Sequence, residues 1–276
     1  MTLALLARME LQRRLIRMPG SEDSTPTWRP IGPREQLGAA IGSLLAPTVA
    51  ALTRLRHARM FHPVGHTFAG HAVGVAGPFE ALGRELTGRV LARMSAALWR
   101  SGWEHLDVLG LALRFRRGPG AELDERAAPG DQDLLTATIR SPFTMLASPF
   151  FTNAHDFMDN RYWAVSPFEH AKVGRVELRL VPITTPYHDP RRASRAERLL
   201  AAVDDGRAGF WLQARRTLTL RWVTCARVQL DRLIVLDQAR LAFDPFRGRL
   251  RPVGVVHAIR RPVYAAGQQA RPRIST

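Results

Sequence analysis

The sequence predicts an α+β protein in which helices at both ends of the chain flank a central antiparallel sheet or barrel. Three observations lead to this fold class. First, leucine and isoleucine recur at helical spacing between Leu37 and Leu55. Second, from Arg59 to Leu236 there are short apolar segments that contain glycines or alternate with polar residues, as strands do. Third, residues 253–271 are typical of a final helix. Helices outside and strands between are expected to give a layered or barrel-like α+β domain.

The N-terminal part predicts helices joined by a linker. Residues 19–33 are rich in proline and small polar residues, which indicates a loop, and Pro47 is expected to kink or split the helix that follows. Before this linker, residues 1–17 alternate leucines with arginines at roughly helical spacing. Such a helix could pack on the domain or lie on an anionic membrane surface.

The central segments differ in how deeply we expect them to be buried. Residues 173–183 alternate apolar and polar side chains, as a half-buried strand does, whereas residues 108–115 read as a fully buried strand. Residues 79–99 look helical and then strand-like, residues 191–203 form a charged helix, and residues 209–236 hold two or three strands.

Composition and charge restrict the partners and the compartment. The formal net charge is +16 and 40 residues are Lys or Arg, yet Lys172 is the one lysine and the arginines are scattered, so we expect no nucleic-acid partner. Cys225 is the single cysteine, which rules out an intramolecular disulfide and favours a reducing, cytoplasmic location. No run of about 18 apolar residues is present, so no transmembrane helix is expected.

The predicted C-terminal helix carries a first group of chemically interesting residues. His257, Arg260 and Tyr264 are spaced i, i+3 and i+7 and therefore share one helical face. A neighbouring guanidinium lowers the pKa of a phenol, and tyrosinate is a hard anionic ligand suited to ferric haem. The alternative interpretation is a solvated arginine face with a tyrosine at the border of the core.

A second group lies near the start of the strand region. His62 is followed by Pro63 and Gly65, so its backbone is expected to be fixed and non-helical, and its imidazole could carry a proton between two peroxide oxygens. Arg59 could pair with an acid such as a haem propionate. A metal site built from His62, His66 and His71 is the alternative, but His71 would point away from the other two and no acidic ligand is close.

Taken in order, these motifs resemble those of the catalase superfamily. The first is Arg59-x-x-His62-x-x-Gly65 and the last is Arg260-x-x-x-Tyr264. Further similar stretches lie between them: Arg93-Met94-Ser95, Asp107 to Phe115, Asp133-Leu134, Ser148 to Phe151, Asp156-Phe157 and Leu241 to Phe246. The similarity extends from Arg54 to Arg271, so we expect an N-terminal helical arm and linker at residues 1–53 and a haem-binding barrel with a C-terminal helix at residues 54–276.

The resemblance implies a closed antiparallel β-barrel with peripheral helices, a buried haem b, and an enzyme that cleaves the O–O bond of a small-molecule peroxide. It further implies a role for each matching residue. His62 is the acid/base and Ser95 orients it, while Tyr264 is the iron ligand and Arg260 keeps it ionised. Arg59 and Arg93 hold propionates, Phe150 or Phe151 packs over the porphyrin, and His257 belongs to the cofactor-binding face.

The chain also departs from the catalase pattern. Thr136, Ala137 and Thr138 stand where catalases have a distal asparagine, Leu109 replaces an arginine, and the chain is far shorter than a full-size catalase. We therefore expect peroxidase chemistry on organic or lipid hydroperoxides more than rapid hydrogen peroxide dismutation. The alternative is a catalase-fold protein that binds haem or another apolar ligand without peroxide turnover. Either kind of protein, the peroxidase or the binding protein, could assemble as a homo-oligomer.

Overall fold

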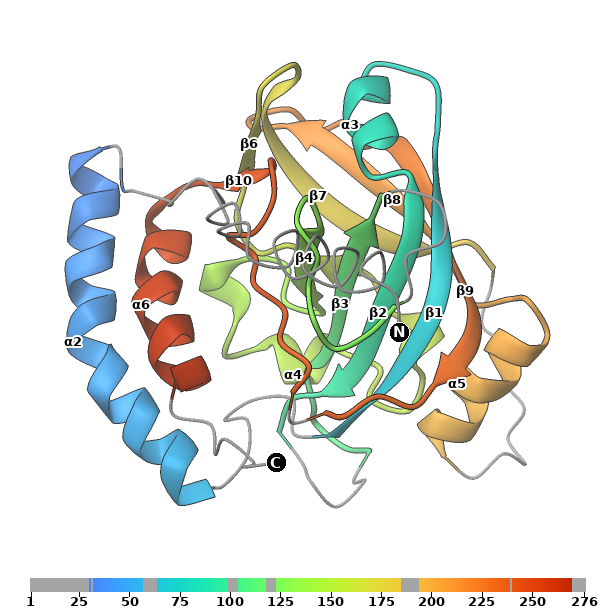
Figure 1. Cartoon of the computed structure of the whole chain (residues 1–276), viewed down its shortest axis with the longest axis horizontal. Coiled ribbons are helices and arrows are strands. Elements are labelled where there is room, and N and C mark those ends of the chain that lie inside the picture. Colours follow the sequence, from blue (N-terminus) through green and yellow to red (C-terminus); the bar gives the residue numbers. More distant parts are fainter. Residues whose placement is uncertain are drawn as a thin grey trace, which may run out of the picture.

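The centre of the molecule is a closed barrel of antiparallel strands, with two long helices packed against each other at one side (Figure 1). The computed structural model describes residues 30, 32–56, 64–98, 104–117, 123–184, 194–238 and 240–269. Among these, eight strands close the barrel in the order β7-β5-β4-β3-β2-β1-β9-β8, and β8 pairs back with β7. The predicted α+β class with an antiparallel barrel is confirmed.

The barrel strands have the following bounds: β1 (Val64–Gly74), β2 (Gly88–Ala96), β3 (Leu109–Arg116), β4 (Gln132–Ala137), β5 (Tyr162–Trp163), β7 (Gly174–Pro182), β8 (Gly209–Arg216) and β9 (Val223–Ile234). Two further short strands, β6 (Phe168–His170) and β10 (Arg251–Pro252), extend the sheet from β7. Segment 209–236 therefore holds two strands. A bulge between Ala69 and Gly70 bends β1, as is common in strongly curved sheets.

Alternation of side chains fills the barrel interior. In β7, Val176, Leu178 and Leu180 are at most 2% exposed, as the sequence pattern predicts, and the residues between them face outward. In contrast, β3 is buried on both faces, because its outward side chains, such as Arg114, are covered as well. Cys225 lies in the core, where burial raises the pKa of its thiol to about 12, which disfavours the reactive thiolate.

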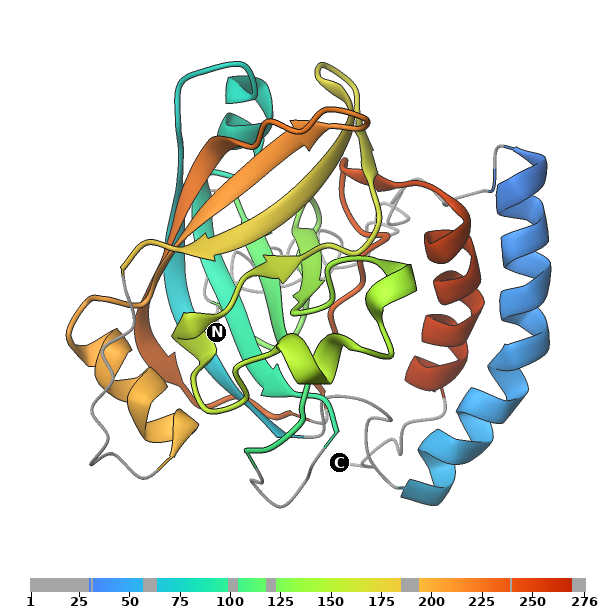
Figure 2. The same cartoon turned by 180° about the vertical axis from the view of Figure 1, so that it is seen from behind.

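Helices α2 (Pro33–Arg56) and α6 (Val255–Gln269) lie side by side in both views (Figures 1 and 2). Glycines let their backbones approach closely, since a Cβ at Gly42 would come within 2.3 Å of the Ile259 carbonyl oxygen. Of the two outcomes expected at Pro47, a kink or a split, the split is excluded, because α2 continues through it to Arg56. The expected boundary between residues 53 and 54 thus falls within α2.

The remaining helices are short: α3 (Glu80–Glu85), η1 (Pro142–Thr144), α4 (Ser148–Phe151), η2 (Phe157–Asp159) and α5 (Arg195–Asp204). Helix α5 confirms the predicted charged helix and begins at a capping box, in which the Ser194 hydroxyl accepts a hydrogen bond from the backbone amide of Glu197. No helix in the described ranges is both long and apolar enough to cross a membrane. Residues 1–29, the first part of the predicted N-terminal arm and linker, lie outside those ranges.

Candidate functional site

Four neighbouring strands present a row of small residues on the outer face of the barrel. Gly65 of β1 pairs with Ser95 of β2, Ser95 pairs with Gly110 of β3, and Gly110 pairs with Ala137 of β4. The strand neighbours of Ser95 and Gly110 point into the barrel core, so the row itself faces outward. Ser95 is nevertheless only 4% exposed. A row without large side chains lets a flat group approach the strand backbones closely.

A buried arginine borders this small-residue row. Arg93 lies on the same outer face in the adjacent row, paired with Thr67 and Ala112, and is 3% exposed. Its guanidinium packs against Gly65, because a Cβ at that position would lie 2.7 Å from the Arg93 Cζ. Its Nε donates a hydrogen bond to Oε1 of Gln238 at 2.8 Å. Gly65, Arg93 and Ser95, which belong to two separate sequence motifs, thus lie on one surface.

The structure describes only some of the residues that we expect to lie above this surface. Arg59 and His62 lie outside the described residues. His66 follows Gly65 directly and is half-buried, and burial lowers the pKa of its imidazole, with a further contribution from the nearby Arg93 charge. His71, on the same strand, is exposed and hydrogen-bonded to Asp231 at 2.8 Å, so it does not join His66 in a common site.

The hydroxyls of the segment that replaces the distal asparagine are occupied. Thr136 donates to the carbonyl of Leu111. The Thr138 hydroxyl oxygen accepts hydrogen bonds from the Leu109 amide at 3.1 Å and from the Thr152 hydroxyl at 2.7 Å. The bonds to Leu111 and Leu109 join this segment to β3, and the bond to Thr152 joins the end of β4 to the residue after α4. The segment has no side-chain amide of the kind expected from the catalase pattern.

Helix α6 carries the C-terminal motif. Its residues Val255, Ala258 and Ile259 face α2, whereas His257 packs against the rings of Phe168 and Phe246 on the barrel side, with centroid distances of 5.2 and 6.1 Å. Helical periodicity places positions 260 and 264 on the same face as position 257. The side chain of Tyr264 lies outside the described part of the structure.

His257 is a buried histidine whose two ring nitrogens have no hydrogen-bond partner among the described residues. Burial, together with the positive charge of Arg260, lowers its pKa to about 3, so it is neutral. The Ser166 backbone opposes this shift slightly without forming a hydrogen bond of good geometry. Unpaired buried nitrogens of this kind often mark the place of a missing polar partner.

This histidine predicts a pH dependence of stability. Because its pKa is lower in the folded state, the unfolded state gains a proton first as the pH falls below about 6.5. The free energy of unfolding should then decrease by up to about 1.4 kcal/mol per pH unit until the pH approaches 3. Urea unfolding of His257→Leu should show a weaker loss between pH 6.5 and 4.5, whereas the exposed His105→Leu should follow the wild type. An unchanged slope in His257→Leu would exclude this source of acid sensitivity.

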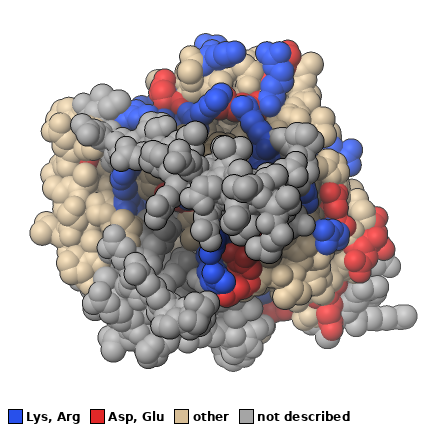
Figure 3. Space-filling view, in the orientation of Figure 1, with Lys and Arg blue, Asp and Glu red and all other residues tan. Residues whose placement is uncertain are grey.

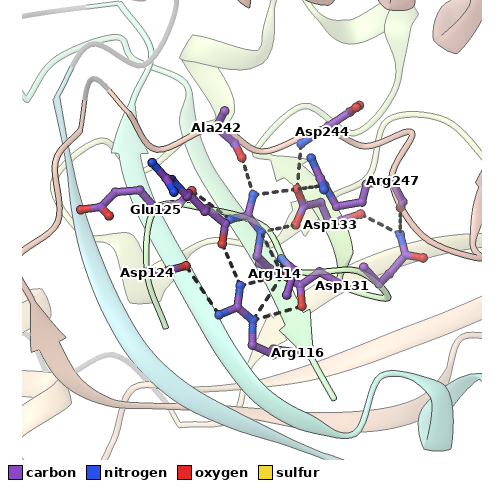
Figure 4. Close-up of polar contacts among 12 residues, drawn as sticks. Arg114, Arg116, Asp124, Glu125, Asp131, Asp133, Ala242, Asp244 and Arg247 are labelled. Carbon is purple, nitrogen blue, oxygen red and sulfur yellow. Dashed lines mark hydrogen bonds and ion pairs between the residues drawn. The ribbon is translucent and has the colours of Figure 1, made fainter. Parts of the chain in front are cut away.

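A buried ionic network holds the segment that leads to α6 (Figure 4). Arg114 of β3 donates to both carboxylate oxygens of Asp133 of β4, at 2.8 and 3.1 Å, and both side chains are fully buried. Arg114 also donates to the carbonyl of Ala242, and Asp133 accepts a hydrogen bond from the amide of Asp244 at 2.8 Å. The network therefore ties residues 242–244 to the outer face of the barrel.

Two phenylalanines predicted to cover a porphyrin lie on the surface in this structure. Phe150 and Phe151 in α4 are 72% and 83% exposed, and Phe143 and Leu146 just before them are 98% and 88% exposed. The hydrogen bond between Thr152 and Thr138 places the end of this apolar segment next to Ala137, the last member of the small-residue row. The segment thus forms an apolar surface at one end of the row.

These features define a catalase-like fold: a closed antiparallel barrel of eight strands with helices on its outside. Among solved structures, a bacterial catalase is similar with a TM-score of 0.53 and 14% identity over 79% of this chain, and a fungal catalase with a TM-score of 0.53 and 12% identity over 78%. The chain spans 57% and 59% of the lengths of these two proteins. No family model and no curated protein sequence matches.

The comparisons confirm the predicted fold, and at this level of identity they concern the fold alone. Of the predicted site residues, the structure brings Arg93 and Ser95 together on the barrel and places His257 and Arg260 on one helix. Sequence reasoning missed Gln238 and the ionic network. The network had a partial signal, since Arg114 is a charged residue within the largely apolar segment 108–115, whereas nothing in the sequence marks Gln238.

Proposed function

We propose that this protein binds haem b against the small-residue row and uses it to cleave the O–O bond of peroxides. The observation that carries the proposal is the row itself. Gly65, Ser95, Gly110 and Ala137 form a surface without large side chains that is buried at Ser95 and Gly110 and half-buried at its two ends, with the Arg93 guanidinium beside it. A planar macrocycle with anionic substituents fits such a surface, because the rings require close approach to the backbone and the propionates require a cation.

The remaining residues would hold the group from the opposite side. Tyr264 would bind the iron as tyrosinate, and Arg260, one turn earlier on the same helical face, would favour the ionised phenol. The unpaired ring nitrogens of His257 are available to a polar substituent or an ordered water. Arg59 and Arg93 would neutralise the propionates. Bound haem would supply the two electrons that reduce the O–O bond, and a reducing substrate would return them, because no side chain described near the row offers this redox chemistry.

The distal residues would handle the proton. His62 accepts the proton from one peroxide oxygen and delivers it to the other, so that the leaving oxygen departs as water or an alcohol. The Ser95 hydroxyl, on the outer face of β2, would orient the imidazole. In this proposal the half-buried His66 is a neighbour and not the acid/base.

The exposed apolar segment around Phe150 supports a bulky, apolar peroxide as substrate. Phe143, Leu146, Phe150 and Phe151 form an exposed apolar surface next to the end of the row.

A second candidate function is a haem or apolar-ligand carrier. It is favoured by Thr138, whose hydroxyl is engaged in hydrogen bonds at the position where catalases have a distal amide.

A single substitution separates the two functions. In haem-loaded protein, His62→Ala should slow the consumption of cumene hydroperoxide by about 10²–10⁴-fold, which is the usual contribution of a general acid/base. His71→Ala is the matched control, because His71 is exposed on β1 and paired with Asp231. Equal rates in wild type and His62→Ala, at equal haem content, would refute the enzyme and leave the carrier.

A further inference from the structure

A second candidate site lies on the outer face of the barrel, next to the end of the small-residue row, since Ala137 of the row pairs with Trp163 of the site. A cavity of about 520 Å³ opens where β5, β7 and β8 adjoin the start of β9. The strands place its side chains by register: Trp163 pairs with Arg179, Arg179 with Gln213, and Glu177 with Arg215. The inward neighbours of these residues fill the barrel core, so the cavity is built from side chains that the strands hold in fixed positions.

The cavity carries more positive than negative charge. Its lining includes the four arginines Arg140, Arg161, Arg179 and Arg215, and a single acidic residue, Glu177. Glu177 is engaged by Arg215, which donates to it twice, at 2.9 and 2.6 Å. Within the described part of the chain, neither Arg140 nor Arg161 forms a hydrogen bond or ion pair. Three guanidiniums therefore meet at this cavity without a counter-charge.

Arg179 is the central member of this arginine cluster. Its Nε donates to Oε1 of Gln213 at 2.8 Å, and no acidic residue of the described chain pairs with it. Burial, and then the charges of Arg161, Arg215 and Arg140, lower its pKa to about 10, so it stays protonated at neutral pH while being repelled by its neighbours. An anion bound among these groups would relieve that repulsion.

A tryptophan holds two of the guanidiniums in place. Arg179 and Arg215 lie over the ring of Trp222, with distances of 4.3 and 4.7 Å from Cζ to the ring centroid. Stacking of this kind orients a guanidinium while its N–H edge stays available for hydrogen bonds. The loss of side-chain entropy on binding an anion is then small, because the donors are already ordered.

We infer that this cavity binds a small polyanion, a molecule with two or more phosphate or carboxylate groups. Guanidiniums bind both kinds of group through paired hydrogen bonds, and a single negative charge would neutralise only one of the three unpaired arginines. The concave shape and the volume suit a small molecule and not an extended macromolecular surface. This inference is independent of haem binding.

The test is calorimetric titration of the full-length protein at 150 mM NaCl with pyrophosphate, citrate and acetate. We expect saturable binding of pyrophosphate or citrate, at least tenfold tighter than that of acetate, and the tighter of the two identifies the group. Arg179→Gln should weaken this binding at least tenfold. Arg161→Gln should weaken it at least threefold, and since Arg161 is exposed and unpaired in the described chain, its loss cannot unfold the barrel.

Arg84→Gln is the control, since it removes the same charge from an exposed residue on α3, where Arg84 pairs with Glu80. Its effect should be less than twofold. Absence of saturable binding by both polyanions would overturn the inference. Equal weakening in Arg84→Gln and Arg179→Gln would also overturn it, because the binding would then reflect the net charge of +16 and not the cavity.

Discussion

Tyr264→Phe is expected to lose haem: the affinity of the purified protein for haemin should fall at least tenfold. The substitution removes the phenolate oxygen that would bind the iron and leaves the ring, so packing within α6 should change little. Titration of haem-free protein with haemin, followed by the growth of the Soret band, measures this directly. The variant should saturate at much higher haemin concentration, or not at all.

Tyr162→Phe provides the control. Tyr162 lies in the barrel core, where its hydroxyl donates to the carbonyl of Phe157 at 2.7 Å, and burial raises its pKa well above the usual value for tyrosine. Loss of that hydrogen bond should lower stability by about 1 kcal/mol without altering the haem spectrum. Full haem occupancy in Tyr264→Phe, with an unshifted Soret band, would contradict the ligand assignment.

Asp133→Asn should lower the free energy of unfolding by about 3–5 kcal/mol, as expected when one partner of a buried ion pair is removed. The amide has nearly the shape of the carboxylate, but it removes the nearest counter-charge of the fully buried guanidinium of Arg114 and leaves, of the described residues, only the more distant Asp131, at 3.9 Å. Burial raises the pKa of Asp133, and the hydrogen bonds and charge of Arg114 oppose that shift. Urea unfolding monitored by circular dichroism measures the effect.

Asp124→Asn is the matched control for the network. Asp124 is 54% exposed and lies 3.6 Å from the guanidinium of Arg116, so its loss should cost less than about 1 kcal/mol. Similar losses in the two variants would mean that the buried network contributes no more than a surface ion pair. Figure 3 shows that basic and acidic side chains both occur on the face in view.

The parts of the fold that were predictable follow from local patterns. Alternation placed β7 and its buried Val176, Leu178 and Leu180, and the capping residues before α5 fit the predicted charged helix. Local propensity could not decide between a kink and a split at Pro47, and packing of α2 against α6 keeps the helix continuous through this residue. The strand order was not readable, since the pairing of β1 with β9 joins segments that are distant in sequence.

The candidate site, like the fold, was predictable from the sequence only where its residues belong to one local motif. The motifs that hold Gly65 and Ser95 could be seen in the sequence, but their pairing on one face depends on strand register. Likewise, the four arginines of the polyanion cavity come from loops and strands up to 75 positions apart, and only the fold gathers them. Chemistry distributed over several strands has no local signature, whereas a motif within one segment does.

The visible absorption spectrum of the purified protein, titrated with haemin, tests the central claim most directly. A flat cofactor held between the small-residue row and α6 should bind in a 1:1 ratio and give the spectrum of a ferric haem with a phenolate ligand. Failure to bind haemin stoichiometrically, or a bound spectrum that is the same in wild type and Tyr264→Phe, would contradict haem ligation by this fold.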